Sequence, residues 1–121
     1  MNKEHSMNAL PDWVTSFPGA VTVSDSALNI IYMNDKSAAT YVKEGGRALL
    51  GKPLMACHNE RSRAIVQSIL DSGGQNVYTI DKAGQKKLIY QSAWRDESGT
   101  VAGLVELSLV LPADMPHFIR G

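Results

Sequence analysis

The second half of the chain alternates apolar and polar residues in three runs that are separated by turn signals. The runs cover residues 75–81, 86–94 and 101–111, and Gly84 and the segment 96–99 lie at the connections between them. Alternation with a period of two predicts strands, and such short connections predict hairpins. The pattern therefore predicts three consecutive antiparallel strands.

The first half of the chain contains two shorter β-type runs, at 20–23 and 29–33, which are separated by polar turn residues. Before them, residues 9–17 carry apolar side chains at helical spacing, and Pro18-Gly19 ends that run. These apolar residues are Leu10, Trp13, Val14 and Phe17. We expect one short amphipathic helix followed by a two-stranded hairpin.

Two asparagines precede segments that have helical character. Asn34 can cap a helix that begins at Asp35 and continues to Gly45-Gly46, because its side-chain oxygen can accept a hydrogen bond from a free backbone N–H group. Asn59 can do the same for a longer helix that Gly73-Gly74 ends. The apolar stripe of this second helix consists of Ile65, Val66, Ile69 and Leu70. The sequence thus places its helices between the second and third strands.

The order of the elements predicts an α+β fold in which an antiparallel sheet carries helices on one face. Residues 1–19 form an N-terminal tail with the short helix, residues 20–111 form the core domain, and residues 112–121 form a C-terminal tail. Prolines in this last segment favour irregular structure, with Phe118 and Ile119 available to dock.

Composition narrows the class of protein. Twelve basic and twelve acidic residues give the 121-residue chain a formal net charge of zero, which argues against a nucleic-acid partner. One cysteine cannot form an internal disulfide, no apolar run is long enough to span a membrane, and the polar start predicts no signal peptide. We expect a cytoplasmic protein without a membrane anchor.

Several short segments resemble the PAS domain, a family of sensor and interaction modules. They are Asp25 with Ile31-Tyr32-Met33-Asn34, Ala38-Ala39, Leu50-Gly51-Lys52-Pro53-Leu54, the Gly84 hairpin, Arg95-Asp96-Glu97-Ser98-Gly99 and Ala102-Gly103-Leu104-Val105-Glu106. Their order and spacing carry the resemblance, which covers about 90 residues. It implies a five-stranded antiparallel sheet, with ligands between the sheet and the helices. It also implies dimerisation through the other face of the sheet and a helix that precedes the core.

The resemblance implies a ligand site around Cys57, His58 and Asn59, where the connecting segment enters the longer helix. Arg61 and Arg63 follow and can pair with a carboxylate, so a small organic acid is one ligand hypothesis. The alternative is that both arginines are simply solvated.

No cofactor is identified by the residues. PAS domains that bind haem use a histidine of the long helix as iron ligand, and His58 is the candidate, although it lies about one turn early. The light-sensing branch has a reactive cysteine three residues after a glycine, whereas here Leu54 holds that place after Gly51. Cys57 is therefore better explained as a small buried apolar residue than as a flavin-reactive thiol.

Two aromatic residues of the fourth predicted strand, Tyr90 and Trp94, are further candidates for ligand contacts. Alternation places them on one face of the strand and Ile89, Gln91 and Ala93 on the other, but the sequence does not decide which face is inward.

These observations predict a sensory PAS domain that binds a small ligand and signals through the geometry of a homodimer. Leu10, Trp13 and Phe17 are the candidate interface residues. The alternative is a protein–protein interaction module that holds no ligand. The sequence has no phosphate-binding loop, metalloprotease motif or nucleophile elbow, so we expect no enzymatic activity.

Overall fold

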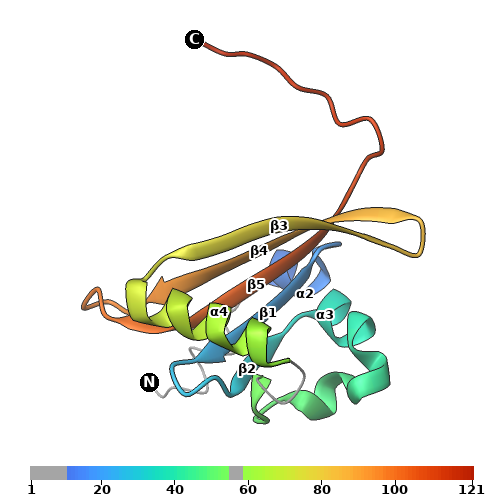
Figure 1. The fold of residues 1–121 in the computed structure, drawn as a ribbon. Coiled ribbons are helices and arrows are strands. Elements are labelled where there is room, and N and C mark those ends of the chain that lie inside the picture. Colours follow the sequence, from blue (N-terminus) through green and yellow to red (C-terminus); the bar gives the residue numbers. More distant parts are fainter. Residues whose placement is uncertain (1–10, 55–58) are drawn as a thin grey trace.

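The computed structural model describes residues 11–54 and 59–121, which form a five-stranded sheet whose helices after the second strand lie against one face (Figure 1). In chain order the elements are α2 (Asp12–Ser16), β1 (Ala20–Asp25), β2 (Ile30–Met33), α3 (Asp35–Thr40), η1 (Val42–Glu44), η2 (Gly46–Leu49), α4 (Glu60–Ser72), β3 (Gln75–Lys82), β4 (Gln85–Arg95) and β5 (Val101–Leu111). The two α-helices and two 3₁₀ segments between β2 and β3 occupy the place that the sequence predicted for helices.

Every strand pair in the sheet is antiparallel, and the strand order is β2-β1-β5-β4-β3. The last strand in the sequence therefore lies at the centre of the sheet, between β1 and β4. The predicted fold class is confirmed, because the hairpins β1–β2, β3–β4 and β4–β5 form as expected. A single long-range pairing, between β1 and β5, joins the two halves of the chain.

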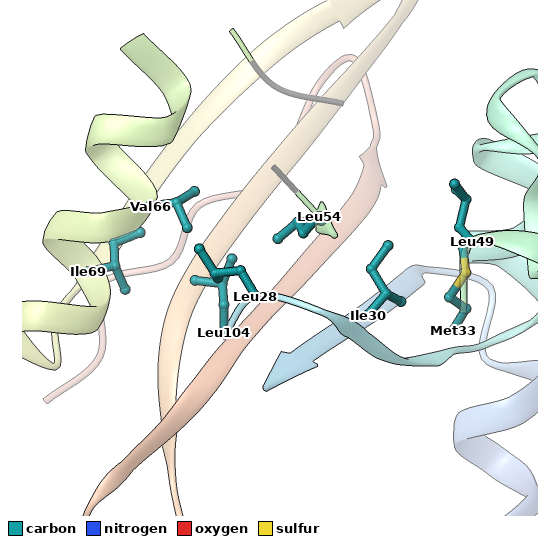
Figure 2. Close-up of a cluster of buried hydrophobic side chains, with 8 residues drawn as sticks. All are labelled: Leu28, Ile30, Met33, Leu49, Leu54, Val66, Ile69 and Leu104. Carbon is teal, nitrogen blue, oxygen red and sulfur yellow. The ribbon is translucent and has the colours of Figure 1, made fainter. Parts of the chain in front are cut away.

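The hydrophobic core lies between the helices and one face of the sheet, which we call the inner face. Figure 2 shows the buried side chains converging from the β1–β2 turn, β2, η2, α4 and β5. They are Leu28, Ile30, Met33, Leu49, Leu54, Val66, Ile69 and Leu104. The longest helix contributes Val66 and Ile69 from the predicted apolar stripe, and Ile65 and Leu70 pack at its margins.

One core residue adopts a backbone conformation that is uncommon for its type. Leu28 has a φ of 64° in the turn between β1 and β2, yet it is buried. The Asp25 carboxylate accepts hydrogen bonds from the N–H groups of Ala27 and Asn29, and the Leu28 N–H donates to the Asp25 carbonyl. This turn holds the left-handed conformation, and burial of the leucine side chain offsets its cost.

The helix after Asn34 is shorter than the sequence predicted. It ends at Thr40, and the two 3₁₀ segments η1 and η2 follow before α4 and β3. Gly45 has a φ of 126° and Gly46 a φ of 57°, so the chain turns within the pair. The predicted helix end at Gly45-Gly46 is therefore wrong: residues 42–44 form a tighter 3₁₀ helix, and a second 3₁₀ helix after the turn brings Leu49 into the core.

The N-terminal helix covers Asp12–Ser16, while the first two residues of the predicted range lie outside the described part of the chain. At the other end, residues 112–121 extend away from the sheet (Figure 1). Phe118 and Ile119 are exposed there, so the docking expected of them is not seen. Within the described ranges no helix has the length and apolar character that crossing a membrane requires.

Candidate functional site

A cleft lies between the first turns of α4 and the inner face of β3 and β4, and we call it the inner cleft. Its volume is about 370 Å³, and it is lined by Asn59, Arg61, Ser62, Ile65, Asn76, Tyr78 and Gln91. One wall comes from the helix and the other from the sheet. Most of the lining side chains carry hydrogen-bonding groups, whereas the neighbouring core is apolar.

The helical wall is held in place by a local cap and by the core. The Asn59 side chain accepts a hydrogen bond of 2.8 Å from the Ser62 N–H, as the sequence predicted for a capping residue. Val66 and Ile69 anchor the following turns in the core. At the other end Gly73 adopts a left-handed conformation and donates to the Ile69 carbonyl. The first turn of α4 is thereby fixed over the sheet.

The sheet wall is organised by a chain of hydrogen bonds that crosses three strands, and we call it the polar ladder. Asn76 Nδ2 of β3 donates to Gln91 Oε1 of β4 over 3.1 Å, and Gln91 Nε2 donates to Glu106 Oε2 of β5 over 2.8 Å. The Tyr41 hydroxyl then donates to Glu106 Oε1 over 2.7 Å. The register explains the alignment, because Asn76 pairs with Gln91 and Gln91 pairs with Glu106.

Glu106 places a carboxylate in the protein interior. The residue is only 9% exposed, and the Tyr41 hydroxyl and the Gln91 amide that donate to it are both neutral. Within the described part of the chain the ion pair present is Arg47 with Asp35, which does not involve this carboxylate. A buried carboxylate that lacks a cationic partner is costly, and such groups are held where they serve a purpose.

Tyr78 brings a titratable group to the same cleft. Partial burial raises its pKa above the usual 10.0, and the negative charge of Glu106 raises this pKa further. The field of the buried carboxylate therefore reaches the lining of the inner cleft. At neutral pH the Tyr78 hydroxyl is protonated and available as a hydrogen-bond donor.

The structure separates the residues that the sequence grouped into one ligand site. Asn59 lines the inner cleft, whereas Cys57 and His58 lie outside the described residues. Tyr90 and Trp94 lie on the opposite, outer face of the sheet, because the inward positions of β4 are those of Gln91 and its alternate neighbours. The register thus settles the question that alternation left open, and neither aromatic residue lines the cleft with Asn59.

The two aromatic residues have other contacts on the outer face. The Tyr90 hydroxyl donates to Gln75 Oε1 over 3.1 Å, and Trp94 Nε1 donates to the Ser24 carbonyl over 2.9 Å. Trp94 is therefore tied to β1 across β5, where Gly103 leaves room for the ring. Its role in this structure is to fasten strands together.

Sequence reasoning singled out Arg61 but missed Asn76, Gln91 and Glu106. The sequence did contain a signal for them, because each of these polar residues lies within a run that predicts a half-buried strand. Each is fifteen residues from the next along the polar ladder. Only the register of the hairpins shows that the three meet at one level of the sheet.

The outer face of the sheet carries a second hollow, which we call the outer groove. Its volume is about 440 Å³, and it is lined almost entirely by apolar side chains from α2, β1, β2, β4 and β5. These are Val14, Val21, Val23, Ile31, Tyr32, Trp94 and Val105. The groove therefore combines the outer sheet face with the helix that precedes the core.

The candidate interface residues lie beside this groove. Trp13 is 66% exposed, and its ring meets that of Phe17 edge to face with the centroids 6.4 Å apart. Leu10 lies outside the described residues. An exposed aromatic pair next to an apolar groove is the composition expected of an interaction surface.

The structure adds no metal or cofactor candidate among the described residues to those that the sequence suggested. Across residues 11–54 and 59–121 no group of three or more His, Cys, Asp or Glu side chains is placed to hold a metal ion. The haem alternative depends on His58, which is outside these ranges, so it stays a prediction.

Comparison with solved structures shows that the chain has a PAS-like fold. The PAS domain of the histidine kinase ThkA aligns with a TM-score of 0.61 and 16% identity, over 75% of this chain and 97% of that one. A structure of the Aer2 receptor from Vibrio cholerae, described as a dual PAS–haem oxygen sensor, aligns with a TM-score of 0.60 and 15% identity. That alignment covers 78% of this chain and 95% of the other.

A third similar structure is a Vibrio cholerae VqmA–ligand–DNA complex, with a TM-score of 0.65 and 12% identity over 92% of this chain. The alignment covers 52% of the VqmA chain, so this protein spans about half the length of VqmA. No family model and no curated protein matches the sequence. The likeness is thus one of fold, and the PAS-like architecture predicted from the sequence is confirmed.

Proposed function

We propose that this chain is a sensory PAS domain that binds a small molecule in the inner cleft. The observation that carries the proposal is the cleft itself, a partly open hollow of about 370 Å³ with a mostly polar lining beside the apolar core. That volume is in the range of small-molecule sites, which combine an apolar surround with a few convergent polar groups. A domain that needed only a packed core would gain stability by filling the space with apolar side chains.

Similar structures support this proposal by what their descriptions state. One VqmA structure is described as bound to DPO, and Aer2 is described as a haem oxygen sensor. Both proteins thus hold a small molecule, and both share the fold of this chain. The chemistry of the ligand here has to follow from the lining residues of this chain.

We further propose that binding is transmitted through the geometry of a homodimer. Gln91 and Trp94 lie on the same strand, the first in the wall of the inner cleft and the second in the outer groove. A ligand that shifts β4 therefore alters the surface that α2 and the outer face offer to a second copy. The ligand needs to bind one dimer arrangement more tightly than the other, because only differential affinity shifts a population.

The ligand part of the proposal is tested by native mass spectrometry of the purified protein, combined with a thermal-shift screen of small molecules. Ser62→Trp fills the inner cleft from the helical wall, while Gln67→Trp places the same side chain on the exposed face of α4 as the control. We expect a bound mass or a thermal shift with the wild type and with Gln67→Trp, and neither with Ser62→Trp. Binding that survives in Ser62→Trp contradicts the assignment to this cleft.

The dimer part is tested by light scattering. Trp13→Asp and Ile31→Asp each place a charge at the outer groove on a side chain that is already exposed, so the fold is preserved. Val42→Asp is the matched control, because Val42 is 67% exposed and does not line the groove. We expect the first two variants to be monomeric and the third to remain dimeric. An unchanged dimer in all three argues against this surface.

The second candidate function is a protein–protein interaction module without a ligand, and the apolar outer groove favours it. The two candidates differ in the native mass, since the module gives a bare dimer that no small molecule stabilises. Either version is proposed as cytoplasmic and without enzymatic activity. The formal net charge of zero argues against a nucleic-acid partner, so the proposal includes none.

A further inference from the structure

Glu106 is the one buried carboxylate in the described structure; it lies behind Gln91, which lines the inner cleft, and no cationic side chain among the described residues pairs with it. Its two oxygens accept from the Tyr41 hydroxyl and the Gln91 amide, which are both neutral. Each carboxylate oxygen can accept more than one hydrogen bond, so capacity remains for a further donor. A cation placed at the cleft wall would offset the cost of burying this charge.

The polar ladder also fixes which atoms face the cleft. Because Gln91 Nε2 donates to Glu106, Gln91 Oε1 has to point toward Asn76, and it accepts from Asn76 Nδ2. Asn76 Oδ1 is therefore left as an acceptor, and no described residue donates to it. Asn76 is only partly buried and lines the cleft, so this oxygen is available to a ligand. The sheet wall thus presents an acceptor, with the Glu106 carboxylate behind Gln91, and this arrangement suits a cationic ligand that donates hydrogen bonds.

The helical wall has the opposite character. Arg61 contributes a guanidinium to the lining of the inner cleft, and Ser62 beside it contributes a hydroxyl. A guanidinium binds a carboxylate through two parallel hydrogen bonds, which makes it selective for planar anions. The first turn of α4 adds a favourable dipole for an anion, and here that effect only supplements the arginine.

We propose that the inner cleft binds a free amino acid, with its ammonium group against Asn76 and Gln91, in the field of the Glu106 carboxylate behind them, and its carboxylate against Arg61 and Ser62. The inference rests on the proposed function, because it names the ligand class of the same cleft. A volume of about 370 Å³ leaves room for a side chain between the two walls. Burial first, and then the Glu106 charge, raise the pKa of Tyr78, and the second cause agrees with a carboxylate close to this lining.

The test uses the full chain and three matched probes. The standard protein amino acids are screened one by one by thermal shift, and the amino acid with the largest shift is compared with two analogues by calorimetry. One analogue is the amine that lacks the carboxylate, and the other is the 2-hydroxy acid that lacks the ammonium group. We expect each analogue to bind at least about tenfold more weakly, because each loses a charge-assisted interaction.

Two variants assign the two ends of the ligand. In Glu106→Gln the affinity for the amino acid is expected to fall about tenfold or more, while the affinity for the 2-hydroxy acid changes little. In Arg61→Gln the amino acid and the 2-hydroxy acid both weaken, while the amine is unaffected. Arg63→Gln is the control on the same helix, since Arg63 does not line the cleft. Arg61 is exposed, so its variant folds even if the buried substitution does not.

The outcomes separate this inference from the proposed function. If neutral molecules or simple acids bind equally to the wild type and to Glu106→Gln, and Ser62→Trp abolishes that binding, the cleft is a ligand site but the amino-acid assignment is wrong. The assignment also falls if no amino acid shifts the melting temperature while native mass spectrometry shows a co-purified molecule of another class. If no small molecule binds by either method, the inference and the proposed function fall together.

Discussion

Asn34 and Asn59 cap two helices through the same kind of hydrogen bond, yet we expect them to contribute very differently to stability. In each case the side-chain oxygen accepts from the N–H group three residues later, over 3.0 Å at Asn34 and 2.8 Å at Asn59. Asn59 is exposed, and this is the hydrogen bond that its side chain makes to the described residues. Asn34 is fully buried. The comparison therefore isolates what burial adds to a helix cap.

The buried asparagine uses all of its hydrogen-bonding groups. Its oxygen accepts from the Val21 N–H as well as from Ser37, over 2.9 Å and 3.0 Å. Its amide donates to the carbonyls of Val14 and Gly19, over 3.0 Å and 2.9 Å. One side chain thus joins α2, the start of β1 and α3. Removing it leaves backbone groups of all three elements without a partner in a place that water does not reach freely.

Asn59→Ala should cost about 1 kcal/mol, the usual value for the loss of an exposed cap. Asn34→Ala should cost about 3–5 kcal/mol, because unsatisfied buried groups carry their full desolvation penalty. Urea denaturation followed by circular dichroism measures both free energies of unfolding. If Asn34→Ala is too unstable to fold, Asn34→Ser keeps an acceptor near Ser37 and gives a measurable lower bound. Equal costs at the two positions would refute the reasoning.

Three further predictions follow from single contacts. Gly103→Ala should lower the free energy of unfolding by about 2–4 kcal/mol in urea denaturation. The added Cβ would overlap the Ser24 carbonyl and come within 2.6 Å of Trp94 Nε1. An unchanged free energy of unfolding would mean that β1 shifts freely. The Ser98 hydroxyl bond, followed by backbone N–H bonds, lowers the pKa of Asp96 below its usual 3.8. The Asp96 carboxylate therefore contributes to the free energy of unfolding above pH 3.8, and this contribution is lost as the pH falls through the lowered pKa. The stability gap between the wild type and an Asp96→Asn variant should accordingly close in acid, and a gap that is constant with pH would count against this. Burial, and then the Glu106 charge, raise the pKa of Tyr78 above 10.0. The protonated tyrosine therefore stabilises the fold fully below pH 10.0, and this contribution is lost as the pH rises through the pKa of the folded state. In an ultraviolet titration Glu106→Gln should lower that pKa without abolishing the shift, and identical curves would show that burial alone is responsible.

Features that depend on neighbours in the sequence were predictable here. The asparagine caps, the glycine stop after α4 and the hairpin loops each depend on a few consecutive residues whose backbone preferences agree. The length of α3 was not predicted, since residues 41–44 have enough helical character to continue the helix. Their shorter 3₁₀ path is chosen because it buries Leu49 against the core, which is a tertiary gain.

The sequence by itself determined the order of the elements, the α+β class, the PAS-like architecture and the stripe by which α4 meets the sheet. Period-two and helical patterns encode these features because each strand or helix carries its own apolar side. Only the tertiary structure decided which face of β4 is inward, and therefore that Gln91 rather than Tyr90 or Trp94 lines the inner cleft. The same registers align Asn76, Gln91 and Glu106 across three strands. The alternation of a strand separates its side chains into two faces but does not show which face is buried. The buried face is decided by how the strand pairs with its neighbours in the sheet.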